Sequence, residues 1–495
     1  MRTSLALLLI LAALLAAVRG MMNLGQGSAG DGGTQALDLY CAAGMRRPVE
    51  ELCSAYERET GVPVRIQYAG SGTLLSSLQA SRSGDLYVAG DVSFVDRAVE
   101  LGLAREVFPL ARMTPVLAVA TGNPLGIQRL EDLSRSDVRL GLGDPGAAAI
   151  GKVTRTVLET SGLWEEVFAG VKVTEPTVES LATALSVGAL DAAIIWDATA
   201  RSHDLEYITL QELSAAPRNV TLGVLTSARQ PAALRLARYL SSGDLGARAF
   251  TEHGFEPVDG DPWDPEPVLS LFSGAMLHAA IDKRITAFEE REGVEVRRTY
   301  NGCGILVAQM RAGATPDAYF SCDTSFLDAV ADRFEPGLDV SRNPIVLVVS
   351  TENPRNIRTL EDLLLEDLRV GLADEEKSAL GALTAKVLHR EGLYDALESS
   401  GNVRVRVPTG DLLVNQLRTG ALDAVLVYLS NAARAGDGVL RLPIHEAAAT
   451  QPWAISTSTR HARLADRLRV ALTDPESRAS FEDLGFDWIL EEDAR

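Results

Sequence analysis

The chain has 495 residues, 46% of them hydrophobic and 23% charged, which is ordinary for globular protein but longer than one hydrophobic core usually supports. Its formal net charge is −20 at pH 7. Nucleic-acid binders need a basic surface that displaces counterions, so this charge argues against nucleic acid as a partner.

The N-terminal segment is typical of an exported protein. Arg2 is followed by an apolar run over residues 5–18, which has the size of a signal-peptide core and is short for a membrane span. We therefore expect residues 1–20 to be a signal peptide or an N-terminal anchor, and the pattern leaves both possibilities open. Residues 21–36 are rich in Gly and Ser and are expected to form a flexible linker.

An internal duplication organises the rest of the chain. Residues 68–72 and 300–304 are variants of one stretch that starts with tyrosine and contains glycine, and they begin 232 positions apart. Asp85 and Asp317 have the same spacing, and the match resumes downstream with a slightly different offset. A repeat of this length is long enough for each copy to bury its own core.

We therefore predict two homologous domains, at residues 37–258 and 268–490. Between them, residues 259–267 are rich in proline and in acidic side chains. This composition predicts a stiff, solvated linker.

Strands and helices alternate along the first domain. Apolar residues at helical spacing predict a helix over 46–60, which Gly61 ends. In chain order we predict strands at 37–41, 62–68, 86–89, 116–120, 138–143, 171–173, 192–196 and 221–226, and helices at 46–60, 71–80, 150–160, 178–187, 232–240 and 247–252. Such alternation predicts parallel sheets with helical crossovers, arranged as two small α/β lobes, and the second domain repeats the plan.

Four strand-to-helix junctions of the first domain are candidate binding elements. Ligands of open α/β sheets bind beyond the carboxyl ends of the strands, where the next helices begin. The junctions at 41–45, 68–72, 143–151 and 175–179 are rich in small or helix-capping residues. Helix N-termini offer unpaired N–H groups and about half a positive charge, so they can bind an anion without Lys or Arg. Small residues at tight turns are also common for architectural reasons alone.

No catalytic constellation, cofactor motif or metal-ligand spacing is present, so we expect neither an enzyme nor a metal or cofactor site. Asp191 and Asp423 precede strands and are interpreted as turn residues. The four cysteines do not make a disulfide framework in so long a chain. Cys53 lies on an apolar helix face and is expected to be buried, and whether Cys41 pairs with it stays open.

Several segments together carry a resemblance to a known family. They are residues 40–45, 68–74, 84–87, 143–145, 162–164 and 254–255, in this order and spacing. With them, each domain resembles the periplasmic molybdate-binding proteins of ABC transporters, a class of extracellular solute-binding proteins. The resemblance implies an α/β fold of two tandem periplasmic-binding-protein-like (type II) domains, each with two lobes and a hinge. The lobes would close over a tetrahedral oxyanion held by hydroxyls and backbone N–H groups.

The family's binding positions fall on identifiable residues of the first domain. Ser71 keeps one binding serine, Gly44 replaces the other and offers only its N–H, and Trp196 replaces a tyrosine. The candidate ligand-binding residues implied here are Ala43, Gly44, Ser71, Gly72, Ile150, Val178 and Trp196.

The second domain departs further from the family pattern. Met276 and Cys303 replace both serines, which implies a weaker oxyanion site, because each lost donor costs about 1–3 kcal/mol. Its candidate residues are Met276, Cys303, Gly304, Leu380, Gly410 and Tyr428. Cys303 at a helix N-terminus is either a reactive thiol of lowered pKa or an inert isostere of serine.

The expected function is that of an exported solute-binding protein, periplasmic or extracellular. Its first domain would bind a small oxyanion such as molybdate or tungstate, for delivery to an ABC permease. The alternative is a membrane-tethered sensory or interaction module that keeps the binding-protein fold without transport.

Overall fold

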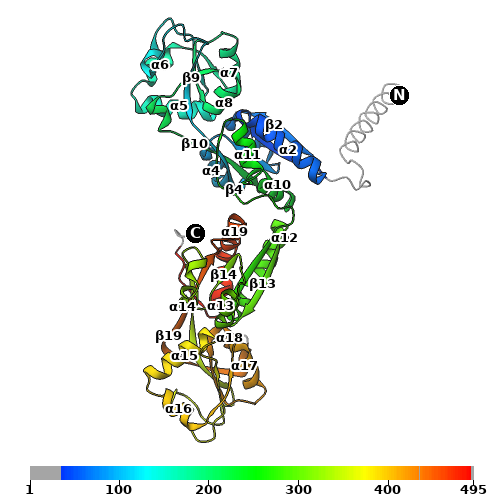
Figure 1. The fold of residues 1–495 in the computed structure, drawn as a ribbon, viewed down its shortest axis with the longest axis vertical. Helices are drawn as coiled ribbons and strands as arrows, with labels where there is room; N and C mark the ends of the chain where they lie inside the picture. The colour runs from blue at the N-terminus through cyan, green and yellow to red at the C-terminus, as the bar shows by residue number, and fades with distance from the viewer. Residues whose placement is uncertain (1–34, 434, 492–495) are drawn as a thin grey trace, which may run out of the picture.

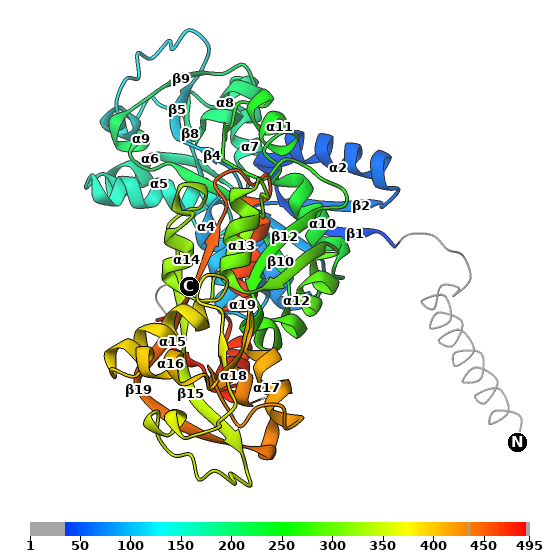
Figure 2. The same cartoon turned by 60° about the horizontal axis from the view of Figure 1, so that its bottom comes forward.

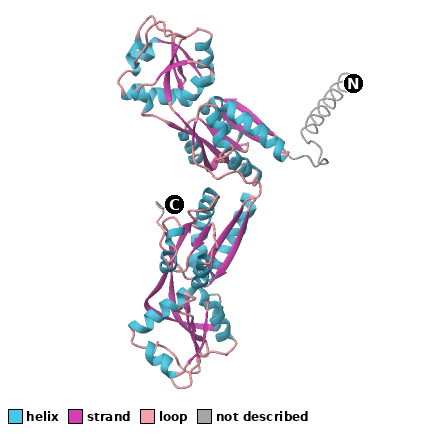
Figure 3. Cartoon of the chain, in the orientation of Figure 1, coloured by secondary structure: helices cyan, strands magenta, loops and turns pink. Residues whose placement is uncertain are grey.

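A computed structural model describes residues 35–433 and 435–491 of the chain. It contains two α/β domains, each built from two lobes, and the four lobes follow one another along the long axis of the molecule (Figures 1 and 3). The signal peptide or anchor predicted for residues 1–20 lies outside the described residues. Over the described ranges, no helix combines the length and the apolar character needed to cross a membrane.

The inner lobe of the first domain holds a six-stranded sheet in the order β11-β4-β10-β3-β1-β2. Its strands are β1 (Leu37–Ala42), β2 (Val64–Ala69), β3 (Leu86–Ala89), β4 (Ala104–Met113), β10 (Arg218–Leu225) and β11 (Glu256–Pro257), and its helices are α2 (Arg46–Thr60), α3 (Ser71–Ser81), α4 (Val92–Glu100), α10 (Ala232–Leu240) and α11 (Gly246–Glu252). Gly61 ends α2 with a left-handed conformation (φ 71°), as its position in the sequence predicts.

The outer lobe of the first domain holds a five-stranded sheet in the order β7-β6-β8-β5-β9. Its strands are β5 (Pro115–Val119), β6 (Leu140–Gly143), β7 (Val171–Glu175), β8 (Ala192–Trp196) and β9 (Glu206–Ile208), and its helices are α5 (Ala149–Thr160), α6 (Trp164–Gly170), α7 (Val178–Ser186), α8 (Asp197–Ser202) and α9 (Gln211–Ser214). The chain enters this lobe between β4 and β5 and returns into β10, so two crossings connect the lobes.

The prediction of parallel sheets is only partly right. β1 pairs in parallel with β2 and β3, and β6 with β7 and β8, because helices carry the chain back between these strands. β10 and β5, which start as the chain crosses from one lobe to the other, are antiparallel to their neighbours.

The second domain repeats this order, but one sheet of nine strands runs through both of its lobes. Its strands are β12 (Val268–Gly274), β13 (Glu295–Asn301), β14 (Ala318–Phe320), β15 (Leu338–Ser350), β16 (Val370–Ala373), β17 (Val403–Val407), β18 (Ala424–Tyr428), β19 (Val439–Ile455) and β20 (Asp487–Trp488). Its α-helices are α12 (His278–Glu292), α13 (Cys303–Arg311), α14 (Thr324–Asp328), α15 (Ala379–Arg390), α16 (Tyr394–Ser400), α17 (Gly410–Arg418), α18 (Leu429–Ala433), α19 (Ala462–Leu472) and α20 (Pro475–Asp483). The long antiparallel strands β15 and β19 connect the two lobes directly.

A network of ion pairs joins the inner lobes of the two domains, where α12 and α19 approach α10 and β4 (Figures 1 and 2). Glu292 of the second domain is fully buried and binds Arg238 of the first domain at 2.9 Å. Arg467 binds both Glu292 and Glu106, and Arg291 lies 3.0 Å from Glu292. Charges of both domains therefore alternate in one buried cluster.

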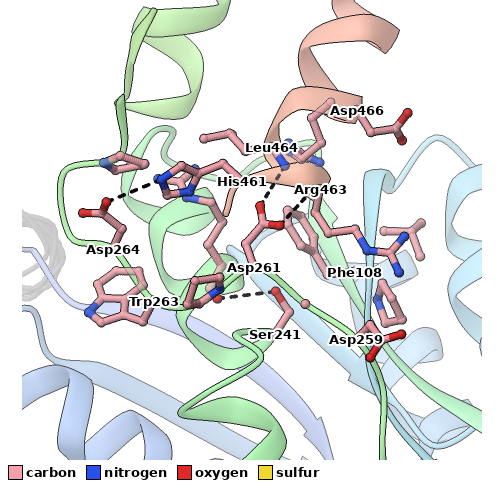
Figure 4. A pocket seen from close by; sticks show the side chains of 17 residues that line it. Phe108, Ser241, Asp259, Asp261, Trp263, Asp264, His461, Arg463, Leu464 and Asp466 are labelled. Atoms are coloured by element: carbon pink, nitrogen blue, oxygen red, sulfur yellow. Dashed lines mark hydrogen bonds and ion pairs between the residues drawn. The ribbon is translucent and has the colours of Figure 1, made fainter. Parts of the chain in front are cut away.

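The linker at residues 259–267 is solvated, as its composition predicts, only in part: Asp259 and Glu266 are exposed, whereas residues 260–264 pack against the protein. The Asp261 carboxylate accepts the N–H groups of Arg463 and Leu464 at the start of α19, both at 2.9 Å (Figure 4). Trp263 Nε1 donates to Glu59 of the first domain at 2.7 Å. A cavity of about 170 Å³ lies between this linker, α19 and β4. Asp261 therefore ties the linker to the second domain and Trp263 ties it to the first.

Candidate functional site

A small cavity lies between the two lobes of the first domain. It has a volume of about 20 Å³, close to the space that one water molecule needs. The ends of β1, β3 and β8 and the starts of α3, α5 and α7 meet around it, as expected for the carboxyl ends of strands in α/β sheets. Its lining residues are Ala42, Ala43, Gly44, Met45, Gly70, Ser71, Gly90, Ala148, Ala149, Ile150, Thr177, Val178 and Trp196.

Ser71, the first residue of α3, is the hydroxyl that the sequence singles out, and the structure places it in this cavity. Its side chain is buried, and its Oγ accepts the N–H of Gly90 at 3.1 Å. Its carbonyl accepts the hydroxyl of Tyr87 at 2.7 Å, and burial raises the pKa of that phenol. A serine hydroxyl can accept and donate at once, so the Ser71 proton is free to donate to a ligand.

Three helices of at least two turns direct their N-termini at the cavity, namely α3, α5 and α7. Thr177 caps α7 by accepting the N–H of Ser180 at 3.2 Å. Each N-terminus adds partial positive charge, and no Lys or Arg from the described part of the chain lines the cavity. The cavity can therefore attract an anion through backbone dipoles alone.

Gly44 and Val178 face each other across the cavity. A Cβ added at Gly44 would lie 3.0 Å from Val178 Cγ1, so the valine occupies the space that a serine side chain would need. At position 44, an apolar side chain from the opposite lobe therefore lies where a serine would place its hydroxyl. Trp196, at the end of β8, closes this side of the cavity and is buried.

The structure brings together most of the candidate residues of the first domain. Ala43, Gly44, Ser71, Ile150, Val178 and Trp196 line the cavity, whereas Gly72 does not. Among the lining residues, Gly90 is the one that lies outside both the four junctions and the candidate residues predicted from the sequence. Gly90 directly follows β3, so its place at the carboxyl end of a parallel strand was the signal that could have found it.

Gly72, together with Gly70 at the edge of the cavity, holds the two lobes against each other. The Gly72 N–H donates to the Ala147 carbonyl of the outer lobe at 2.9 Å. A Cβ at Gly72 would lie 2.0 Å from the Gly146 carbonyl oxygen, and one at Gly70 would lie 2.2 Å from that of Pro176. The structure is therefore a closed form, in which glycine alone fits at this contact.

In the second domain, Cys303 is neither a reactive thiol nor an inert isostere of serine. It forms a disulfide with Cys322, with a Cα–Cα distance of 6.3 Å. Cys322 lies 232 positions after Gly90, and its N–H points at Cys303 Sγ at 3.1 Å, as the N–H of Gly90 points at Ser71. A covalent bond therefore reinforces a hydrogen-bonded contact of the first domain. Both predictions for Cys303 assumed a free thiol and are wrong.

Most of the remaining candidates of the second domain are buried apolar or aromatic residues. Met276, Leu380 and Tyr428 are buried, and the Tyr428 hydroxyl has no hydrogen-bond partner among the described residues. Burial raises the pKa of this phenol. Gly304 repeats the lobe contact of Gly72, because its Cβ would lie 2.2 Å from the Glu376 carbonyl oxygen. Gly410 begins α17.

The other two cysteines, Cys41 and Cys53, are both buried and free, which answers the open question of their pairing. Burial raises the pKa of Cys53 to about 12 and that of Cys41 well above its ordinary value. Both thiols stay protonated near neutral pH and act as small apolar side chains.

Asp191 and Asp423 hold strands in place. Each accepts hydrogen bonds from the backbone N–H and the guanidinium of one arginine, Arg139 and Arg369 respectively. The hydrogen bonds from these arginines lower the pKa of both carboxyl groups. The two carboxylates, which occupy equivalent positions in the repeat, therefore have a structural role.

A thiol count tests the disulfide. We expect the unreduced, denatured chain to react with two equivalents of a thiol reagent, from Cys41 and Cys53, and the reduced chain with four. Reduction should also lower the melting temperature of the second domain, because a crosslink over 19 positions contributes roughly 3 kcal/mol. Four reactive thiols in the unreduced chain would contradict the pairing. Cys53→Ala is the control, and it should leave one reactive thiol and an intact disulfide.

Comparison with known proteins gives the family. The model of the bacterial extracellular solute-binding proteins matches residues 37–256 and again residues 269–487. The chain belongs to this family. The two matched segments cover both domains described above, so each domain is a copy of the solute-binding fold.

Individual relatives match one domain at a time. A protein of Haemophilus influenzae described as a binding protein is 32% identical over 227 residues, 45% of this chain and 91% of the relative. The molybdate-binding protein ModA of Mycobacterium bovis is 29% identical over 187 residues, 36% of this chain and 68% of the relative. The solved periplasmic molybdate-binding protein of Azotobacter vinelandii has 17% identity and a TM-score of 0.40, and covers 45% of this chain and 100% of its own.

Proposed function

We propose that the first domain of this solute-binding protein binds a small oxyanion of the molybdate or tungstate type. The observation that carries the proposal is the convergence of Ser71 and three helix N-termini on one buried cavity without a charged side chain. Backbone N–H groups and hydroxyls suit a fully ionised anion, because they donate hydrogen bonds and such an anion has no proton to donate in return. The molybdate-binding relatives support the same ligand class.

The candidate residues take separate roles in this proposal. Ser71 donates its hydroxyl, and the N-terminal N–H groups of α5 and α7, at Ile150 and Val178, contact the anion from the outer lobe. Ala43, Gly44 and Trp196 shape the cavity, so selectivity depends on its size. Gly72 contributes to closure instead of contacting the ligand.

The proposed setting is an exported chain that delivers its ligand to an ABC permease. The second domain has a different proposed role, because a disulfide takes the place of the serine hydroxyl there. It is proposed to be a diverged domain without an oxyanion site of its own. A tethered sensory or interaction role is the second candidate, and it predicts normal ligand binding but no permease-dependent uptake.

Calorimetry on the full chain tests the ligand. We expect one site per chain for molybdate or tungstate, and weaker or no heat for sulfate and phosphate. Ser71→Ala should weaken binding by about 10- to 100-fold, because a buried anion that loses one donor loses roughly 1–3 kcal/mol. Ser77→Ala, on the exposed part of the same helix, is the matched control and should bind normally. Neither heat nor thermal stabilisation with all four anions would overturn the proposal.

A further inference from the structure

One position of the repeat carries, in both domains, a buried polar group without a hydrogen-bond partner in the part of the chain that the structure describes. Thr199 in α8 and Asn431 in α18 lie 232 positions apart, each three residues after the end of the preceding strand, at Trp196 and Tyr428. Both side chains are buried, with 2% and 3% of their surface exposed. Thr199 Oγ1 and Asn431 Oδ1 have no hydrogen-bond partner among the described residues.

The Thr199 hydroxyl lies near Gly44, the position at which the cavity lacks a hydroxyl, and Thr199 itself lies just behind the lining residues. Thr199 Oγ1 lies 3.8 Å from where a Cβ at Gly44 would stand, and Gly44 lines the cavity. A buried hydroxyl without a partner destabilises the folded chain, unless a ligand supplies the missing hydrogen bond.

We propose that Thr199 is a further oxyanion-binding residue, whose hydroxyl replaces the one missing at Gly44. This role of Thr199 rests on the proposed function. The residue at the same position of the second domain, Asn431, keeps anions away from the start of α17. Thr199 reaches the ligand from the segment that follows β8, so it donates from a different side than Ser71 on α3. Two hydroxyl donors are thereby restored in the first domain.

Asn431 presents the opposite chemistry in the second domain. The Asn431 Nδ2 group donates to Asp411 Oδ1 at 3.0 Å. This hydrogen bond fixes the orientation of the amide, so its oxygen points away from Asp411. Asn431 Oδ1 lies 2.4 Å from where a Cβ at Gly410 would stand, so it covers the start of α17. In the first domain Val178 begins the corresponding helix α7 beside the cavity. A carbonyl oxygen at this place occupies the region of positive potential and repels an incoming oxyanion.

The test compares four forms of the full chain, namely wild type, Thr199→Val, Thr199→Ser and Thr199→Asn. Valine has the shape of threonine without the hydroxyl, so we expect Thr199→Val to weaken molybdate or tungstate binding by about 10- to 100-fold in calorimetry. Its melting temperature without ligand should stay the same or rise, because an unpaired buried hydroxyl is removed. Thr199→Ser keeps the donor and should keep most of the affinity. Thr199→Asn copies the second domain and should abolish binding.

Each outcome decides between the two proposals. If the wild type binds and Thr199→Val binds equally well, the role of Thr199 is overturned while the proposed function stands. If Thr199→Val melts at a lower temperature without ligand, the hydroxyl has a structural partner, which also overturns it. If the wild type binds none of molybdate, tungstate, sulfate and phosphate, the proposed function fails and this inference fails with it.

Discussion

Gly72→Ala is expected to prevent closure of the first domain and to weaken oxyanion binding by about 100-fold or more. The Cβ of alanine would lie 2.0 Å from the carbonyl oxygen of Gly146, far inside van der Waals contact. The Cβ is fixed by the backbone of residue 72, and the oxygen is part of the backbone of Gly146. Neither can rotate away, so the overlap is relieved only when the lobes move apart. Moving apart also breaks the hydrogen bond from the Gly72 N–H to the Ala147 carbonyl.

The size of the effect follows from the population of the closed form. Apparent affinity falls in proportion to the fraction of molecules that can adopt the binding-competent conformation, so a closed fraction of about one in a hundred gives about a 100-fold loss. Calorimetry measures the affinity, and small-angle scattering with saturating ligand measures whether the lobes close.

Gly170→Ala is the matched control, because it is the same substitution in the same domain. The nearest atom to its new Cβ would lie 4.0 Å away, so binding should stay unchanged. An affinity of Gly72→Ala equal to that of the wild type would show that the lobe contact plays no part in ligand binding.

Glu292→Gln is expected to uncouple the two domains. Glu292 is fully buried and binds Arg238, Arg291 and Arg467, and only Glu106 would remain as an anion among these three arginines. Removing one partner from a buried ion pair costs roughly 3–5 kcal/mol, because the remaining charges stay desolvated without compensation.

Scanning calorimetry measures the result. The wild type should unfold in one transition, and Glu292→Gln should unfold at lower temperature in two separate transitions, one for each domain. Oxyanion affinity should change little, because the network lies between the inner lobes, away from the cavity. Glu256→Gln removes an exposed pair with Arg112 and is the control, for which a change of about 0–1 kcal/mol is expected. A single transition at the wild-type temperature in Glu292→Gln would contradict a role for this network.

Local patterns were sufficient for much of the fold. The apolar spacing of α2 and its end at Gly61 were readable directly, because helix periodicity and a left-handed terminal glycine depend on neighbours in the chain. The β4 strand and the α4 helix were not predicted. The pairing of β4 with β10 joins residues more than a hundred positions apart, so its register depends on contacts that sequence periodicity does not contain.

The candidate site was also predictable in part. The family pattern predicted Ser71, Ile150, Val178 and Trp196 as site residues, and all four line one cavity. This was possible because strand ends and helix starts are local features that the fold places together. The disulfide of Cys303 was missed, although its partner Cys322 follows the neighbouring strand β14. Four cysteines allow several pairings, and spacing alone does not choose among them.

The sequence by itself determined that this protein is a duplicated α/β chain, since repeats and periodicity are properties of the linear order of residues. Only the tertiary structure revealed the contacts of Gly72, Thr199 and Glu292 on which their proposed roles rest. These roles depend on contacts between distant segments of the chain. Gly72 meets the Ala147 carbonyl, Thr199 lies near Gly44, and Glu292 binds the guanidinium of Arg238. Steric fit, desolvation and charge pairing act through space, so they became visible only when the lobes and domains were in contact.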